Sequence, residues 1–155
     1  MKDFFKKNIV TILGFFVIIS VIIYAFFMHL EREQSLIKGK TLYTVGEVVH
    51  YKSHGKMGLS IGYSFLFDGI KIETTNHPDE PLKNSIYKRY EYDYEKIRKL
   101  LIGKKFFVKV SIENPKYSLI YLSKPVAVGF QYVEGQTWET IPKGAIENKD
   151  IYDNY

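Results

Sequence analysis

The chain has 155 residues, 46% of them hydrophobic and 25% charged, with a formal net charge of +5. This hydrophobic content excludes a disordered tail, and the charge excess is too small to indicate a nucleic-acid-binding domain. No cysteine is present, so disulfides, thiolate metal sites and a cysteine nucleophile are excluded. The thirteen Tyr and eleven Phe favour β-strands.

The N-terminal part of the chain contains a long apolar segment, residues 9–30, without Asp, Glu, Lys or Arg. As an α-helix it would span about 33 Å, enough to cross a hydrocarbon core of about 30 Å. A helix in the core of a soluble protein rarely stays apolar on every face over that length. We therefore predict a transmembrane helix over 8–30, with the lipid bilayer as the partner of residues 9–30.

The flanks of this segment indicate an uncleaved signal anchor. The apolar run is longer than the h-region of a signal peptide, and charged residues follow it instead of small ones. Lys2, Lys6 and Lys7 precede it closely, although a similar number of basic residues, beginning with Arg32, follows. Their proximity predicts that the N-terminus stays inside, so that a single-pass protein of the cell inner (cytoplasmic) membrane carries its C-terminal domain outside the cytoplasm.

After the anchor the residue pattern changes to a period of two. Residues 41–51 and 59–67 are rich in β-branched and aromatic side chains and are separated by a turn-forming stretch. Asp68-Gly69 precedes a further alternating run over 70–75, and Asp-Gly between two such runs indicates a type I′ hairpin. The sequence therefore predicts a three-stranded antiparallel meander over 41–75.

The next part of the chain is less clear in its periodicity. Residues 76–85 contain two prolines among polar residues and are predicted as a loop. Residues 86–102 fit both a helical face and, over 90–94, the alternation of a strand. A helix over 92–102 that ends at Gly103 is favoured, and the strand alternative stays open.

The C-terminal part is predicted to return to strands. Residues 105–113 and 117–122 are expected as strands, with Asn114-Pro115 as the turn between them. Residues 126–133 are a candidate for one more strand, and 138–141 are expected to pack back onto the sheet. The expected fold is an N-terminal transmembrane helix followed by a mainly β (α+β) domain, an antiparallel small barrel or sandwich with one short helix.

These patterns divide the chain into five parts. Residues 31–40 are either a helical extension of the anchor or a linker that stops near Gly39, and the end of the chain is polar and expected to fray. The predicted parts are a basic tail (1–7), the transmembrane helix (8–30), a juxtamembrane linker (31–40), a β-rich soluble domain (41–142) and a polar C-terminal tail (143–155).

Five short motifs in the β-rich part follow one order. They are Gly46-Glu47-Val48, Tyr63-Ser64-Phe65, Asp68-Gly69, Val108-Lys109-Val110 after Gly103, and Asn114-Pro115-Lys116-Tyr117-Ser118. This order resembles a widespread bacterial family of small membrane-associated β domains of unknown function, whose pattern is G-x-V, Y-x-F, V-x-V and N-P-x-x-S. The chain has Ser111-Ile112-Glu113 where that family usually has a Tyr and an extra Pro. The resemblance covers about half the chain and implies fold and membrane association, not an activity.

Two groups of residues formally match catalytic or metal-binding patterns. Gly58 to Gly62 read G-x-S-x-G around Ser60, but a nucleophile elbow needs a strand-to-helix turn on a larger α/β sheet. We expect the two glycines to ease a turn and a β-bulge instead. His50 and His54 are four residues apart, which in a strand is about 13 Å, too far for one metal ion.

His77 precedes Asp79 and Glu80 on a Pro-containing loop, where an imidazole and two carboxylates are usually solvated. The acids would need burial to act as an acid–base pair, and the sequence gives no sign of it. We therefore predict solvent-exposed histidines, and no catalytic, cofactor-binding or metal-binding residues.

Tyrosines and basic residues alternate over 87–99 in a way superficially like platforms that stack single-stranded nucleic acid. Glu91, Asp93 and Glu95 largely cancel these bases, so no nucleic-acid partner is predicted. We expect this stretch to pack tyrosines on the sheet, the alternative being a contact surface for a partner or for lipid headgroups.

The expected function is that of a membrane-anchored, non-catalytic binding or scaffolding module of the cell envelope, with an envelope protein as partner and no cofactor. The alternative is a small membrane-bound hydrolase or metal-dependent enzyme that uses Ser60 or the histidines His50, His54 and His77. A third possibility is an accessory protein that acts through its membrane helix, although the helix has no G-x-x-x-G pair.

Overall fold

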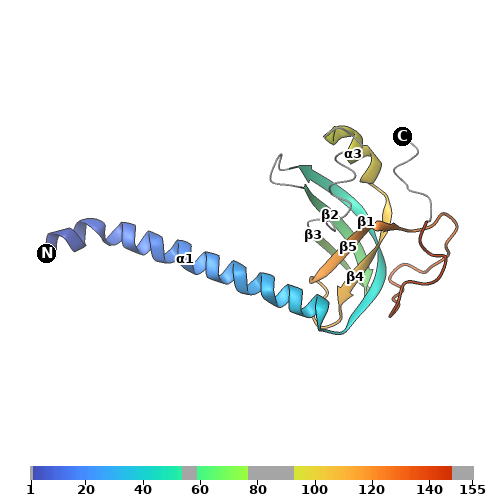
Figure 1. Cartoon of the computed structure of the whole chain (residues 1–155), viewed down its shortest axis with the longest axis horizontal. Helices are drawn as coiled ribbons and strands as arrows, with labels where there is room; N and C mark the ends of the chain where they lie inside the picture. The colour runs from blue at the N-terminus through green and yellow to red at the C-terminus, as the bar shows by residue number, and fades with distance from the viewer. Residues whose placement is uncertain (1, 54–58, 77–92, 148–155) are drawn as a thin grey trace.

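The computed structural model describes residues 2–53, 59–76 and 93–147. Its N-terminal element is a continuous helix, α1 (Lys2–Ile37), which projects from a β-rich domain (Figure 1). Over Thr11–Ile37 this helix is long and apolar enough to cross a membrane, and none of its most apolar window is buried in the protein. A role as the core helix of a soluble domain is therefore excluded for this segment, and residues 31–37 are its helical extension.

The domain is a five-stranded antiparallel sheet with one short helix inserted between its third and fourth strands. The strand order is β3-β2-β1-β4-β5, so three consecutive strands are followed by one that returns beside the first, as in a Greek key. The predicted meander and the mainly β (α+β) layout are confirmed. Strands β3 and β5 are edges within the described sheet, which is not closed into a barrel. The elements are β1 (Thr41–Ser53), β2 (Leu59–Phe67), β3 (Ile70–Asn76), α3 (Tyr94–Leu101), β4 (Lys105–Ser111) and β5 (Ser118–Pro125).

Strand β1 is shared between the two halves of the sheet. Its first part, 41–47, pairs with β4, and its last part, 46–53, pairs with β2, so only Gly46 and Glu47 of this strand pair with both β2 and β4. A Cβ added to Gly46 would lie 2.6 Å from Val108 Cγ2 and 3.2 Å from the Ser64 carbonyl oxygen. A glycine in a strand interior marks such a close approach, which lets the sheet curl at this point.

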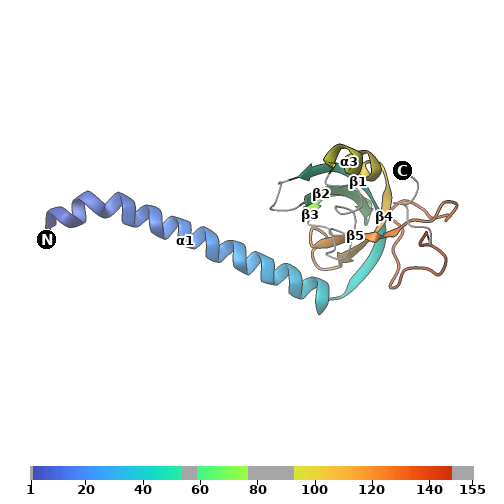
Figure 2. The same cartoon turned by 45° about the horizontal axis from the view of Figure 1, so that its top comes forward.

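The main hydrophobic core lies on the concave side of the sheet and is covered at one end by α3 (Figure 2). On α3, the apolar residues Ile97, Leu100 and Leu101 face this core, while its charged residues stay outside. The Tyr63 hydroxyl and Ser118 Oγ form a buried hydrogen bond of 2.9 Å between β2 and β5. The strands contribute these buried core residues: Val48, Ile61, Tyr63, Phe65, Phe67, Phe106, Val108, Val110, Ile120 and Leu122.

Helix α3 ends before Gly103, as the sequence predicts, and its start at Tyr94 is set by an N-cap at Asp93. The Asp93 carboxylate caps its first turn by accepting a hydrogen bond from the Lys96 N–H at 3.1 Å. Gly103 follows the C-cap with a φ of +74°, which is the left-handed conformation expected of a glycine at that position. Of the predicted helix over 92–102, the part 94–101 is confirmed, and residue 92 lies outside the described residues.

Replacing Asp93 with alanine is expected to destabilise the domain at neutral pH more than at acidic pH. The hydrogen bond from the Lys96 N–H, helped by the Lys96 ammonium at 3.4 Å, lowers the pKa of the Asp93 carboxyl. Because the folded-state pKa is lowered, this stabilisation is present above the unfolded pKa and is lost as the pH falls through the folded value. Thermal unfolding of the wild type and variant over a pH series measures the difference.

The matched control is Asp93→Asn, because asparagine caps helices well but has no charge to titrate. Its stability relative to Asp93→Ala should not change across the same pH range. A loss in Asp93→Ala that is equal at every pH would contradict this role of the carboxylate.

The outer face of the sheet carries a second apolar cluster, covered by the segment after β5. Phe107 of β4 is fully buried there, with its ring centroid 6.1 Å from that of Trp138 and 6.3 Å from that of Phe130. Tyr132 stacks on Phe130 at 6.0 Å. The prediction of a strand over 126–133 is wrong, because this segment forms only an isolated bridge at Val126 and otherwise lies as an irregular cover.

The predicted return of residues 138–141 to the sheet is confirmed at Trp138. Its backbone exchanges two hydrogen bonds with Tyr43, at 2.7 and 2.9 Å. Further along, Ala145 is fully buried and accepts a hydrogen bond from the Ala127 N–H at 2.8 Å. Ordered contacts of the domain therefore continue past residue 142, and the last one described is made by Glu147.

Candidate functional site

A groove of about 660 Å³ lies between the last part of β1 and helix α3. Both elements are held in place by backbone hydrogen bonds, from the Gly103 N–H to the Val48 carbonyl and from the Val48 N–H to the Lys104 carbonyl. The groove exists because β1 continues beyond the point at which α3 meets the sheet. Its lining residues are Val49, His50, Tyr51, Lys52, Tyr94, Glu95, Arg98, Lys99 and Ile102.

A β-bulge in β1 sets which side chains of this strand enter the groove. The pairing with β2 shifts by one residue between Val48 and His50, opposite Tyr63 and Gly62, so Val49 is the extra residue. The His50 ring lies directly over Gly62, and any Cβ at that glycine would collide with it. The second glycine of the G-x-S-x-G match therefore stands at a bulge and makes room for an imidazole.

The His50 ring is oriented by the neighbouring edge strand. Its Nε2 lies 3.4 Å from the Thr75 hydroxyl, and its Nδ1 lies 4.0 Å from a carboxylate oxygen of Glu73. The imidazole side chain is 49% exposed, so it can be reached from solvent. This arrangement suits a hydrogen-bonding residue at the rim of the groove.

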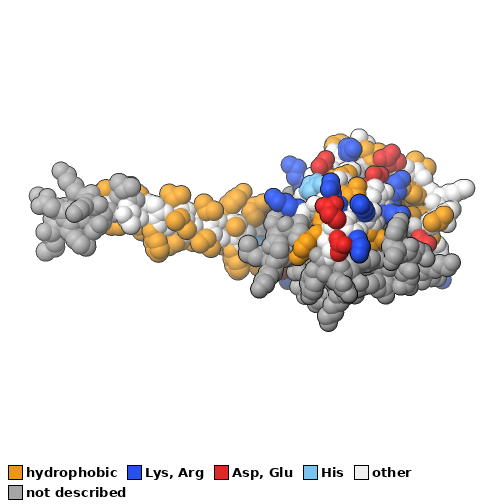
Figure 3. All heavy atoms as spheres, turned by 90° about the horizontal axis from the view of Figure 1, so that it is seen from above, with side chains coloured by type: hydrophobic (Ala, Val, Ile, Leu, Met, Phe, Trp, Pro, Cys, Tyr) orange, Lys and Arg blue, Asp and Glu red, His pale blue; other side chains and the backbone are white. Residues whose placement is uncertain are grey.

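The groove combines an apolar, aromatic surface with a basic rim. Lys52, Arg98 and Lys99 face one acidic residue, Glu95, whose carboxylate lies 3.9 Å from the Arg98 guanidinium. Figure 3 looks onto this end of the domain and shows basic, acidic and histidine side chains close together. The groove therefore has more basic than acidic groups, together with an apolar aromatic surface. This combination suits a ligand that is acidic and partly apolar.

A smaller hollow of about 440 Å³ lies on the outer face, where β1 meets the covering segment. Lys105 projects there with its Nζ 5.5 Å from the centre of the Tyr132 ring. Its hydrogen bond to Tyr132, and then the carboxylates of Glu47 and Glu134, raise the pKa of Lys105. Since these groups interact mainly with one another, this hollow is a weaker candidate for a ligand site.

The structure places some, but not all, of the residues in the predicted catalytic and metal-binding patterns. Ser60 lies inside β2, opposite Lys52 of β1, and the strand continues to Phe67, so this serine is not at a strand-to-helix turn. His54 and His77 lie outside the described residues, as do Asp79 and Glu80. Within the described ranges, no group of three or more His, Asp or Glu residues is placed to hold a metal ion.

Part of the Tyr-rich stretch can also be placed. Tyr94 packs against the core as expected, while Arg98 and Lys99 are exposed at the groove. Residues 87–92 lie outside the described part of the chain. Sequence reasoning missed the groove because its two walls come from segments about forty residues apart, and only the sheet pairing brings them together.

Comparisons with known proteins do not assign a family or a ligand to this groove. No protein family, no curated protein and no solved structure matches this chain.

Proposed function

We propose that this protein is a single-pass, membrane-anchored, non-catalytic binding module of the cell envelope, with its domain outside the cytoplasm. The observation that carries the proposal is an exposed apolar helix that runs without a break into a domain with an open groove. The resemblance of the strand motifs to bacterial membrane-associated β domains points the same way.

The end of α1 supports an anchor that is retained. Leu36 is buried against the domain, and the Arg32 guanidinium donates a hydrogen bond of 2.9 Å to the Ser118 carbonyl. Both residues lie within two helical turns of the end of the apolar segment. Removal of the helix as a signal peptide would therefore expose apolar and polar groups of the domain that α1 covers.

The chemistry of the groove supports an acidic segment of another envelope protein as the ligand. Lysine and arginine side chains attract carboxylates and set the orientation of approach, whereas Tyr51, Tyr94 and Ile102 supply apolar contact area. A binding role needs no convergent catalytic groups.

Site-specific photo-crosslinking from the groove tests this proposal. A photoreactive residue in place of Lys99 should capture a defined partner in membranes, whereas one in place of Val128, which is 91% exposed outside the groove, should not. Charge reversal of two rim residues together, Lys52→Glu and Arg98→Glu, should abolish capture from a crosslinker placed at Ile102.

The matched control reverses two exposed lysines outside this groove, Lys71→Glu and Lys143→Glu, with the same change in net charge. Equal capture by the groove and control variants would contradict the assignment of the groove as the binding site.

A reporter that is active only outside the cytoplasm, fused after Tyr155, tests the orientation. The basic N-terminal tail predicts activity in this fusion. Activity from a cytoplasmic reporter at the same position would reverse the proposed topology.

A further inference from the structure

The last two turns of α1 are fixed to one end of the domain. Besides the contacts of Leu36 and Arg32, the Tyr117 hydroxyl is hydrogen-bonded to the Glu31 carboxylate. Burial and then this carboxylate raise the pKa of Tyr117, which therefore stays a neutral donor. Ser118 accepts from Arg32 through its carbonyl and contacts the Tyr63 hydroxyl through its side chain, so α1 is connected directly to the core.

The connection between α1 and β1 is short and bonded on both sides. The Lys38 and Gly39 N–H groups bond to the Gln34 carbonyl at 2.8 and 3.2 Å, and the Lys40 carbonyl accepts from the Ile112 N–H at 3.0 Å. A Cβ at Gly39 would lie 2.5 Å from the Ser35 carbonyl oxygen, which shows how closely the chain turns here. The connection is a fixed corner and not a flexible tether.

These contacts determine how close the domain lies to the bilayer. With residues 9–30 in the hydrocarbon, Glu31 and Arg32 stand about 1.5–3 Å beyond its boundary, at a rise of about 1.5 Å per residue. The headgroup region on each side is about 5–7 Å thick. Because Tyr117 and Ser118 are bonded to these two helix residues, they lie at the same level.

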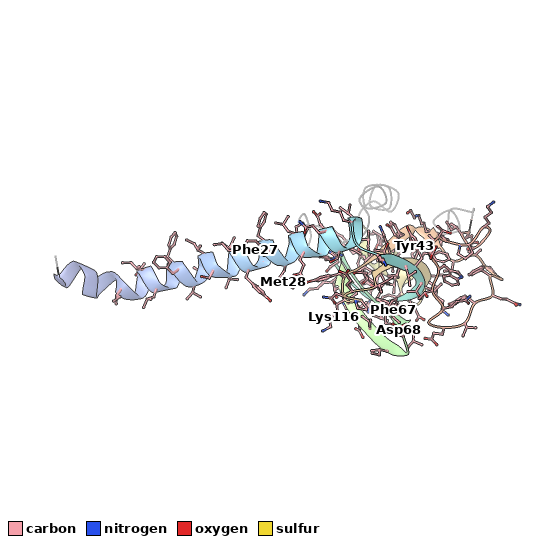
Figure 4. All side chains as sticks on the ribbon, turned by 90° about the horizontal axis from the view of Figure 1, so that it is seen from below. Phe27, Met28, Tyr43, Phe67, Asp68 and Lys116 are labelled. Atoms are coloured by element: carbon pink, nitrogen blue, oxygen red, sulfur yellow. The ribbon has the colours of Figure 1, made fainter. Side chains whose placement is uncertain are left out.

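We infer that the β4–β5 loop, residues 112–117, lies in the lipid headgroup layer and is a second membrane contact of the protein. This inference depends on the proposed membrane crossing of α1. The exposed Lys116 can reach lipid phosphates, while its neighbour Tyr117 is buried and holds the loop beside α1. Figure 4 shows Lys116 on the side of the domain that faces α1, and Ile112 in the same loop is 43% exposed.

The absence of cysteine makes a direct test possible with the full chain. Single cysteines at Lys116, Val17 and Val128 are spin-labelled in vesicles of phosphatidylcholine and phosphatidylglycerol. Accessibility to oxygen and to a water-soluble nickel complex then gives the depth of each label. Val17 should report hydrocarbon, Lys116 the headgroup layer and Val128 bulk water, with nickel accessibility severalfold lower at Lys116 than at Val128.

The labels separate failure of this inference from failure of the proposed function. High accessibility of the Val17 label to the nickel complex would overturn the membrane crossing itself. If the Val17 label lies in hydrocarbon but the Lys116 label is as accessible to nickel as the Val128 label, only the headgroup contact is overturned. Fluorescence of Trp138, the single tryptophan, verifies that each labelled protein is folded.

A variant of the helix contacts provides the second measurement. Arg32→Ala with Tyr117→Phe removes both polar bonds to α1 and should raise nickel accessibility at Lys116 severalfold, with Val17 unchanged. The matched control is Arg98→Ala on α3, which lies at the end of the domain away from its junction with α1 (Figure 1), and this variant should leave the Lys116 label as it is. No change in the double variant would overturn the role of these bonds in holding the loop at the bilayer.

Discussion

Replacing Phe107 with alanine is expected to lower the free energy of unfolding of the domain by about 3–5 kcal/mol. The side chain is fully buried between the outer face of the sheet and the segment after β5, where it contacts the rings of Phe130 and Trp138. Its removal leaves a cavity under a cover that has few regular hydrogen bonds. Denaturant unfolding followed by Trp138 fluorescence measures the loss, since this indole belongs to the same cluster.

Phe130→Ala is the matched control, because Phe130 has the same chemistry but is only partly buried. It should lose clearly less stability than Phe107→Ala. A loss below about 1 kcal/mol for Phe107→Ala, the average effect of a point substitution, would mean that the covering segment is not packed on β4.

The second large effect is expected at Gly46, where alanine should lower the free energy of unfolding by about 1–3 kcal/mol through overpacking. The added methyl group would meet Val108 Cγ2 at 2.6 Å and the Ser64 carbonyl at 3.2 Å. Val108→Ala removes the first clash, so the double variant should be more stable than the sum of the single losses predicts. A double-mutant cycle by denaturant unfolding measures this coupling, expected at about 0.5–3 kcal/mol.

Gly14→Ala serves as the control for Gly46→Ala, because a Cβ at Gly14 meets nothing within 4 Å. It should leave the unfolding of the domain unchanged. Strictly additive losses in the Gly46 and Val108 cycle would show that the two positions are not in contact.

Local chemistry made most of the fold predictable. Asp68 and Gly69 adopt φ values of 50° and 76°, as a two-residue type I′ hairpin requires, and this turn fixes the register of β2 with β3. Gly103 likewise ends α3 as predicted. In such places one or two residues determine the backbone, so a sequence pattern is sufficient.

The covering segment and the groove could not be predicted in the same way. The apolar residues of 126–133 look like a strand, but Gly129 has a φ of +89° and Val128 is 91% exposed, so the chain turns instead of pairing. Burial of Phe107 decides this conformation, and that is a tertiary effect. The shape of the groove depends on the β-bulge at Val49 of β1. In the sequence, the only signal for the position of this bulge is Gly62 on the opposite strand.

The attachment of α1 to β1 has a mechanical consequence. Strand β1 is the central strand of the sheet, bonded to β4 over 41–47 and to β2 over 46–53. Because antiparallel hydrogen bonds lie perpendicular to the strands, tension along β1 loads them together in shear. An edge strand would instead peel away one bond at a time. Tension applied to β1 through α1 would therefore be resisted by the hydrogen bonds to both neighbouring strands together.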